Sequence, residues 1–155
     1  MSGNNKVTAV DAIKMLAISS LVPMMDKFPL LEQTIKASKS DKPAEEWDFF
    51  IVSACVGLVL MTDESYKGEH EAIENRLNDL DKNYLRAVND LSKFFGNAPD
   101  DLDVQIATIG HWVLWNVKKD NPTDDEIKTL AFPIGQYIMN TVHSIRQEKI
   151  GQEQD

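Results

Sequence analysis

The spacing of apolar residues predicts helices along most of the chain. Over residues 69–95 seven apolar positions recur at intervals of three or four residues: Ile73, Leu77, Leu80, Tyr84, Val88, Leu91 and Phe95. This is the spacing of one face of an α-helix. It predicts one long helix over 69–95, which Gly96 and Pro99 would end.

The most apolar stretch lies before that helix. From Trp47 to Met61, 12 of 15 residues are apolar. A helix of that length spans about 22 Å, too short for a hydrocarbon core of about 30 Å. A helix that is apolar on every side belongs in the middle of a bundle, so we predict a buried central helix over about 44–62. Its β-branched residues leave a buried strand as the alternative, but the rest of the chain offers no strand to pair with it.

Polar and proline-containing breaks divide the remaining chain into further helices, which we expect over 8–21, 30–37, 100–119 and from 123 toward the C-terminus. Thr123 followed three residues later by Glu126 is typical of a capping box, which would begin the last helix. Pro133 is expected to kink that helix or to divide it near Ala131, because proline lacks the N–H that a helix interior uses.

Together these elements predict an all-α fold: a single-domain antiparallel helical bundle of five to seven helices over 1–155, around the central helix at 44–62. The ends, about 1–6 and 150–155, are polar, and we expect them to be disordered. The connections after residue 95 are short, so successive helices should run antiparallel.

Composition narrows the classes of partner. The chain has 16 Lys and Arg residues against 25 Asp and Glu residues, a net charge of −9. Such an acidic protein is repelled by nucleic-acid phosphates and anionic lipids, so we expect no nucleic acid and no membrane among its partners. Its single cysteine, Cys55, excludes an internal disulfide. With no export signal at the start, the sequence favours a cytoplasmic location.

The sequence patterns of common active sites are missing. The glycines do not have the spacing of a phosphate-binding loop, and there is no Gly-x-Ser-x-Gly or Glu-x-x-His motif. We therefore expect no catalytic residues, no metal and no cofactor, and a protein that is not an enzyme. Cys55 is expected to act as a small buried hydrophobic residue, and His111 and His143 as residues at the edge of the core.

Negative charge is concentrated in the second half of the chain. Residues 1–62 carry a net charge of −1 and the rest carry −8. If the last three helices alternate in direction, two of their acidic starts meet at one end and form a surface for a basic partner. The predicted residues are Glu69, Glu71, Glu74, Asp120, Asp124, Asp125 and Glu126. The alternative is that these carboxylates only complement helix dipoles and maintain solubility.

Trp112 and Trp115 form a second apolar stripe beside the core-facing stripe of the helix at 100–119. Two apolar faces on one helix mean that both are buried or that one meets a partner, for which tryptophan is a favoured anchor. Self-association through this stripe is a further option.

These observations favour a non-catalytic protein-binding module of the inhibitor, immunity or adaptor type, which engages a basic protein through its acidic end. The alternative is a bundle that encloses a small apolar ligand or cofactor among Met15, Met24, Met25, Met61, Trp112 and His143. An enzyme without familiar motifs is a third class.

Overall fold

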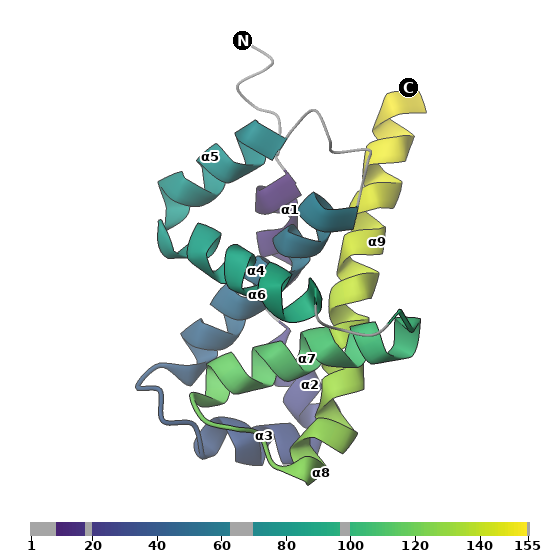
Figure 1. Ribbon diagram of the computed structural model, residues 1–155. Helices are drawn as coiled ribbons and strands as arrows, with labels where there is room; N and C mark the ends of the chain where they lie inside the picture. The colour runs from purple at the N-terminus through teal and green to yellow at the C-terminus, as the bar shows by residue number, and fades with distance from the viewer. Residues whose placement is uncertain (1–8, 18–19, 63–69, 97–99, 155) are drawn as a thin grey trace.

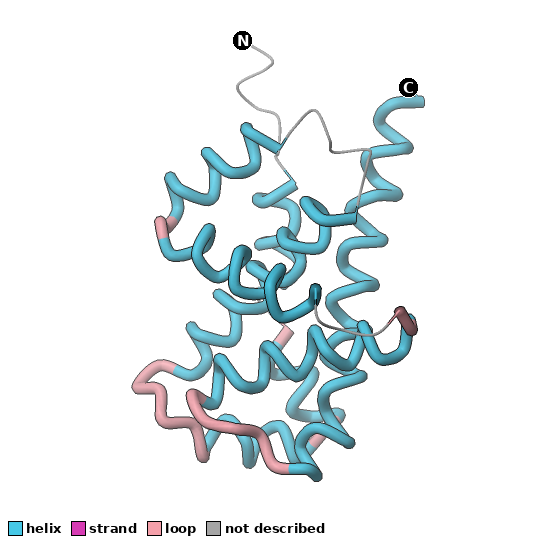
Figure 2. Tube along the Cα trace, in the orientation of Figure 1, coloured by secondary structure: helices cyan, strands magenta, loops and turns pink. Residues whose placement is uncertain are grey.

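The protein is a bundle of helices, seen in a computed structural model that describes residues 9–17, 20–62, 70–96 and 100–154 (Figure 1). Within those ranges every regular element is helical and none is a strand (Figure 2). The all-α prediction is therefore confirmed. In chain order the elements are α1 (Ala9–Ala17), α2 (Leu21–Lys27), α3 (Pro29–Lys36), α4 (Pro43–Thr62), α5 (His70–Leu80), α6 (Asn83–Gly96), α7 (Leu102–Lys118), α8 (Asp124–Glu126), the π-helical turn η3 (Ile127–Ala131) and α9 (Phe132–Gln154).

The helix α4 lies at the centre, as its composition predicts. It packs against α1, α6, α7 and α9. Every residue from Ile51 to Val59 is buried. Two polar groups in it find partners inside the protein. The Trp47 indole N–H donates to the Ser20 hydroxyl at 2.9 Å, and the Ser53 hydroxyl donates to the Phe49 carbonyl at 2.7 Å. Because these groups are satisfied, a helix that is apolar on every side is stable in the core.

The N-terminal region contains one helix more than the sequence predicts. Pro23 was expected to interrupt the chain, but it lies in the first turn of α2. The first backbone N–H groups of a helix have no intrahelical acceptor, so a proline there loses no hydrogen bond. Pro29 begins α3 in the same way, as predicted.

The single long helix predicted over 69–95 is wrong. The helical structure is interrupted at Asp81 and Lys82, and α5 and α6 form a helical hairpin (Figure 1). The Asp81 carboxylate accepts the Asn83 backbone N–H at 2.8 Å, which is an alternative to the helical hydrogen bond. The apolar spacing continues across the turn from Leu80 to Tyr84. For that reason the pattern alone did not reveal the break.

The last helix does not divide, but its hydrogen-bond pattern changes from α-helical to π-helical for one turn. The elements α8, η3 and α9 are continuous, and the π-helical turn η3 ends two residues before Pro133. The predicted disturbance near Ala131 therefore takes the form of a wider turn, at the place where the proline disfavours regular α-helix. The capping box is confirmed, because the Thr123 hydroxyl accepts the Glu126 N–H and the Glu126 carboxylate accepts the Thr123 N–H.

The loop between α3 and α4 is attached to the C-terminal end of α7. The Ser38 hydroxyl donates to the Val117 carbonyl at 2.7 Å, and the Lys39 backbone N–H donates to the Lys118 carbonyl at 3.1 Å. These bonds satisfy carbonyl groups that the end of a helix leaves without partners. They hold the end of α7 near the start of α4, where the candidate site lies.

Candidate functional site

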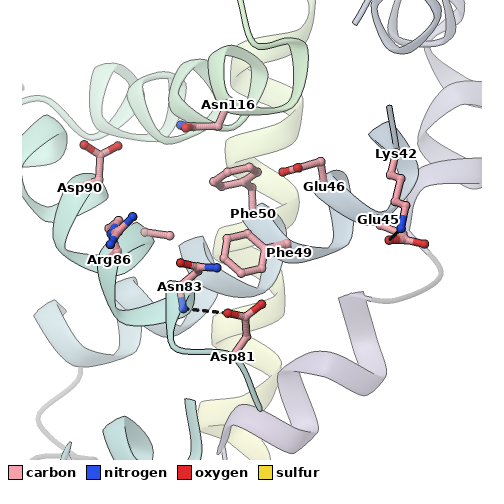
Figure 3. A pocket seen from close by; sticks show the side chains of 11 residues that line it. Lys42, Glu45, Glu46, Phe49, Phe50, Asp81, Asn83, Arg86, Asp90 and Asn116 are labelled. Atoms are coloured by element: carbon pink, nitrogen blue, oxygen red, sulfur yellow. Dashed lines mark hydrogen bonds and ion pairs between the residues drawn. The ribbon is translucent and has the colours of Figure 1, made fainter. Parts of the chain in front are cut away.

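A groove of about 550 Å³ lies where the first half of α4 meets α6 and the end of α7 (Figure 3). A volume of this size can hold a small ligand or one or two amino-acid side chains. Its lining residues are Lys42, Glu45, Glu46, Phe49, Phe50, Asp81, Asn83, Arg86, Ala87, Asp90 and Asn116.

The floor of the groove is aromatic. Phe49 and Phe50 lie edge to face at a centroid distance of 5.0 Å, between the α6 and α7 sides of the groove (Figure 3). Phe49 stacks on Tyr84 at 4.5 Å, and Phe50 meets the edge of Trp112 at 5.5 Å. Such aromatic pairs hold one another in preferred geometry, so the two phenyl rings form a rigid surface.

Carboxylates predominate on the rim of the groove, with four of them against two cationic side chains. Glu46 pairs with Lys119 at 3.5 Å, and Glu45 lies 4.0 Å from Lys42. The Asp90 carboxylate accepts the Trp112 indole N–H at 2.9 Å. An aromatic floor with a carboxylate rim is suited to a cation, because ring faces and carboxylates both attract positive charge.

A second, smaller hollow of about 260 Å³ also borders Phe49 and Glu45. Asp48, Tyr84 and Lys14 contribute to its lining. Burial raises the pKa of the Asp48 carboxyl. The two hollows have Phe49 and Glu45 in common, so a second recess with carboxylates lies beside the same ring.

The ionisable side chains that line the groove are four carboxylates, one guanidinium and one ammonium. No histidine, cysteine, serine or threonine is among its lining residues. In the described part of the chain, no group of three or more His, Cys, Asp or Glu side chains is placed to hold a metal ion. The arrangement offers charged groups beside aromatic rings.

The predicted acidic end is not formed. Glu71 and Glu74 lie exposed on α5, and Asp120, Asp124 and Asp125 lie exposed at the turn before α8 and on α8 itself. In Figure 1, α5 and α8 are at opposite ends of the molecule. The sequence did not predict the hairpin at Asp81, and the expected antiparallel order also fails where α7 crosses α9. Glu69 lies outside the described residues.

Glu126 is not a surface residue, contrary to its predicted place in that acidic end. It is only 5% exposed. Its carboxylate accepts hydrogen bonds from Lys118 at 2.7 Å, from the Thr123 backbone N–H at 2.7 Å and from the Thr34 hydroxyl. Burial by itself would raise the pKa of Glu126, but these three hydrogen bonds outweigh it and hold the pKa below its ordinary value. Glu126 therefore joins α3, α7 and α8.

The two tryptophans of α7 have different surroundings. Trp112 is 1% exposed and belongs to the core, so of the two alternatives that the sequence left open for it, burial is correct and the partner-binding surface is not. Trp115 is 44% exposed and touches Phe94 edge to face at 6.1 Å. His111 meets the same Phe94 ring at 5.7 Å, and burial lowers the pKa of its imidazole. Only Trp115 of the pair is on the surface that a partner can reach.

The residues suggested for an internal ligand are not gathered. Met15 is 74% exposed and His143 is exposed, whereas Trp112 packs against Phe50. The side chain of Met61 lies outside the described residues. Cys55 is buried as predicted, and burial raises the pKa of its thiol far above the ordinary value.

The groove residues were not among the predicted site residues. In the sequence, Glu45 and Glu46 are ordinary first-turn carboxylates, and Phe49 and Phe50 resemble the rest of an apolar helix. They form a site only because α6 and α7 flank the same part of α4. The one signal that the sequence contained was the overlap of acidic and aromatic residues at the start of that helix.

No protein-family model, curated protein or solved structure matches this chain. In the ranges that the structure describes, no helix has both the length and the apolar character needed to cross a membrane.

Proposed function

We propose that this chain is a non-catalytic protein-binding module whose groove between α4, α6 and α7 holds a basic segment of a protein partner. The observation that carries the proposal is the pairing of a rigid phenyl floor, Phe49 and Phe50, with a carboxylate rim. A lysine or arginine side chain fits this chemistry, because its alkyl stem packs on the rings and its charged end reaches the carboxylates.

The net charge of the chain supports the same class of partner. At −9 the protein attracts basic proteins within about a Debye length and speeds their encounter, most strongly at low salt. The groove then supplies the short-range contacts that net charge alone lacks. This division between steering and docking is common in electrostatically guided complexes.

The proposal is tested with a fluorescein-labelled oligolysine peptide, whose binding is followed by fluorescence anisotropy at low salt. In the variant Glu45→Gln with Glu46→Gln, two rim charges are lost, and we expect binding to weaken about tenfold. The matched control is Asp124→Asn with Asp125→Asn, which removes two exposed charges from α8. This control should bind almost as well as the unaltered protein.

Two results would overturn the proposal. One is an equal loss of binding in both double variants, because the peptide would then respond to net charge alone. The other is a loss only in the Asp124 and Asp125 variant, which would move the binding site to α8. Substituting Phe50→Leu adds a readout that net charge does not influence, and it should weaken binding at constant charge.

A further inference from the structure

A lysine that is not itself a lining residue of the groove contacts two residues that are. The Lys119 ammonium lies 5.8 Å from the centroid of the Phe50 ring and 3.5 Å from a carboxylate oxygen of Glu46. These are the two kinds of contact that the groove offers to a partner's lysine. Resting on the proposed function, we infer that Lys119 is an internal competitor, and that a basic side chain of the partner displaces it from Phe50 and Glu46.

The backbone fixes where Lys119 begins. Its φ of 60° is the only positive value among the described residues other than glycine, and its N–H caps α7 by donating to the Trp115 carbonyl. A left-handed residue at this position is a common end to a helix, but glycine is the usual choice. With lysine there, the side chain that leaves the turn is a cation, and it reaches Phe50 and Glu46.

The side chain remains free to leave. It is 43% exposed, so its pairing with Glu46 is a surface ion pair of small net strength. The residues on both sides of it have other partners. The Lys39 backbone N–H donates to the Lys118 carbonyl, and the Lys39 ammonium pairs with the Asp120 carboxylate at 3.1 Å. Displacement therefore needs only rotation of the Lys119 side chain and no change of fold.

A second lysine provides an internal comparison. Unlike Lys119, Lys42 is a lining residue of the groove, and it lies 4.0 Å from Glu45. The cation–ring contacts of the described residues involve Lys27 and Lys119 and not Lys42. Removing either lysine changes the net charge by the same amount. Only the removal of Lys119 vacates the face of Phe50, so the difference between the two variants measures competition and not charge.

The experiment uses the full chain and the same labelled oligolysine peptide. Lys119→Ala should bind the peptide about tenfold more tightly than the unaltered protein, and Lys42→Ala no more than about twofold more tightly. Lys119→Arg keeps the cation and should bind like the unaltered protein. In a Phe50→Leu background the extra gain from Lys119→Ala should disappear, because the contested ring face is absent.

Equal gains in peptide affinity from Lys119→Ala and Lys42→Ala would overturn the inference that Lys119 competes with the partner. A lower affinity of Lys119→Ala than of the unaltered protein would also overturn it. Those results leave the proposed function standing if the Glu45 and Glu46 variant still weakens binding. Failure of the peptide to bind the unaltered protein and Lys119→Ala alike overturns both proposals. Thermal unfolding of each variant confirms that the fold is retained before binding is compared.

Discussion

The backbone of Gly110 in α7 lies directly against the backbone of Ala131 in η3. A Cβ atom on Gly110 would stand 1.7 Å from the Ala131 carbonyl oxygen. The contact is reciprocal along the same crossing, since a Cβ on Gly135 of α9 would stand 1.9 Å from the Ile106 carbonyl oxygen. In Figure 1, α7 lies across this last helix, and the two glycines allow the backbones to touch.

This crossing predicts a strong effect of a single methyl group. Gly110→Ala should lower the free energy of unfolding by about 3 kcal/mol or more, because the new atom meets backbone that has no rotamer to change. Gly135→Ala should act similarly. The matched control is Gly96→Ala at the end of α6, where a Cβ has no neighbour within 4 Å. Its effect should stay within about 1 kcal/mol.

Urea unfolding followed by circular dichroism measures all three variants. If Gly110→Ala unfolded at the same urea concentration as the unaltered protein, the close crossing of α7 and η3 would be wrong.

The buried carboxylate of Glu126 predicts a dependence of stability on pH. Its pKa in the folded protein lies below the ordinary value, because its hydrogen bonds from Lys118, Thr123 and Thr34 outweigh the effect of burial. A depressed carboxyl pKa contributes stability above the unfolded pKa of about 4.3, and this contribution is lost as pH falls through the lower folded pKa. Glu126→Gln should therefore lower stability at pH 7 by about 2–3 kcal/mol, since it leaves Lys118 without its charge partner.

The difference between Glu126→Gln and the unaltered protein should shrink as the pH is lowered below about 4. Asp125→Asn, one residue away and exposed, is the control and should change stability by about 0.5 kcal/mol or less. Denaturant titrations across the pH range provide the measurement. If the difference in the free energy of unfolding between the Glu126 variant and the unaltered protein were the same at every pH, the lowered pKa of Glu126 would be contradicted.

The contrast between Trp112 and Trp115 predicts two different responses. Trp112→Ala should cost about 3–5 kcal/mol, because it leaves a large cavity beside Phe50 and removes the donor to Asp90. Trp115→Ala should cost about 1 kcal/mol or less, since the ring is 44% exposed.

Acrylamide quenching of tryptophan fluorescence provides an independent check. Trp115→Phe should remove most of the quenchable emission, because Trp47 and Trp112 are fully buried. If Trp112→Phe removed most of the quenchable emission instead, the placement of Trp112 in the core and Trp115 on the surface would be wrong.

Several elements were predictable because their causes are local. The burial of α4 follows from a run of apolar residues that no single face can hold. The capping box at Thr123 and Glu126 requires only a spacing of three residues. The disturbance before Pro133 follows from a missing N–H.

Other features required contacts that no window of sequence contains. Leu80 and Tyr84 keep helical spacing across the turn at Asp81, so the periodicity concealed the break between α5 and α6. Trp112 and Trp115 have the same side chain. Trp112 is buried because Asp90 and Phe50 lie beside it, and this placement is a property of the tertiary structure. Phe50 and Lys119 are distant in sequence, and their contact depends on where α7 ends.

The sequence by itself determined that this protein is helical, which helix is central and that its surface is acidic, because local spacing and composition decide those properties. Only the tertiary structure decided where the acidic helix starts lie and which aromatic rings face solvent. The turn at Asp81 and the crossing of α7 over α9 both depend on contacts between distant parts of the chain, and α5 and α8 lie at opposite ends of the resulting bundle.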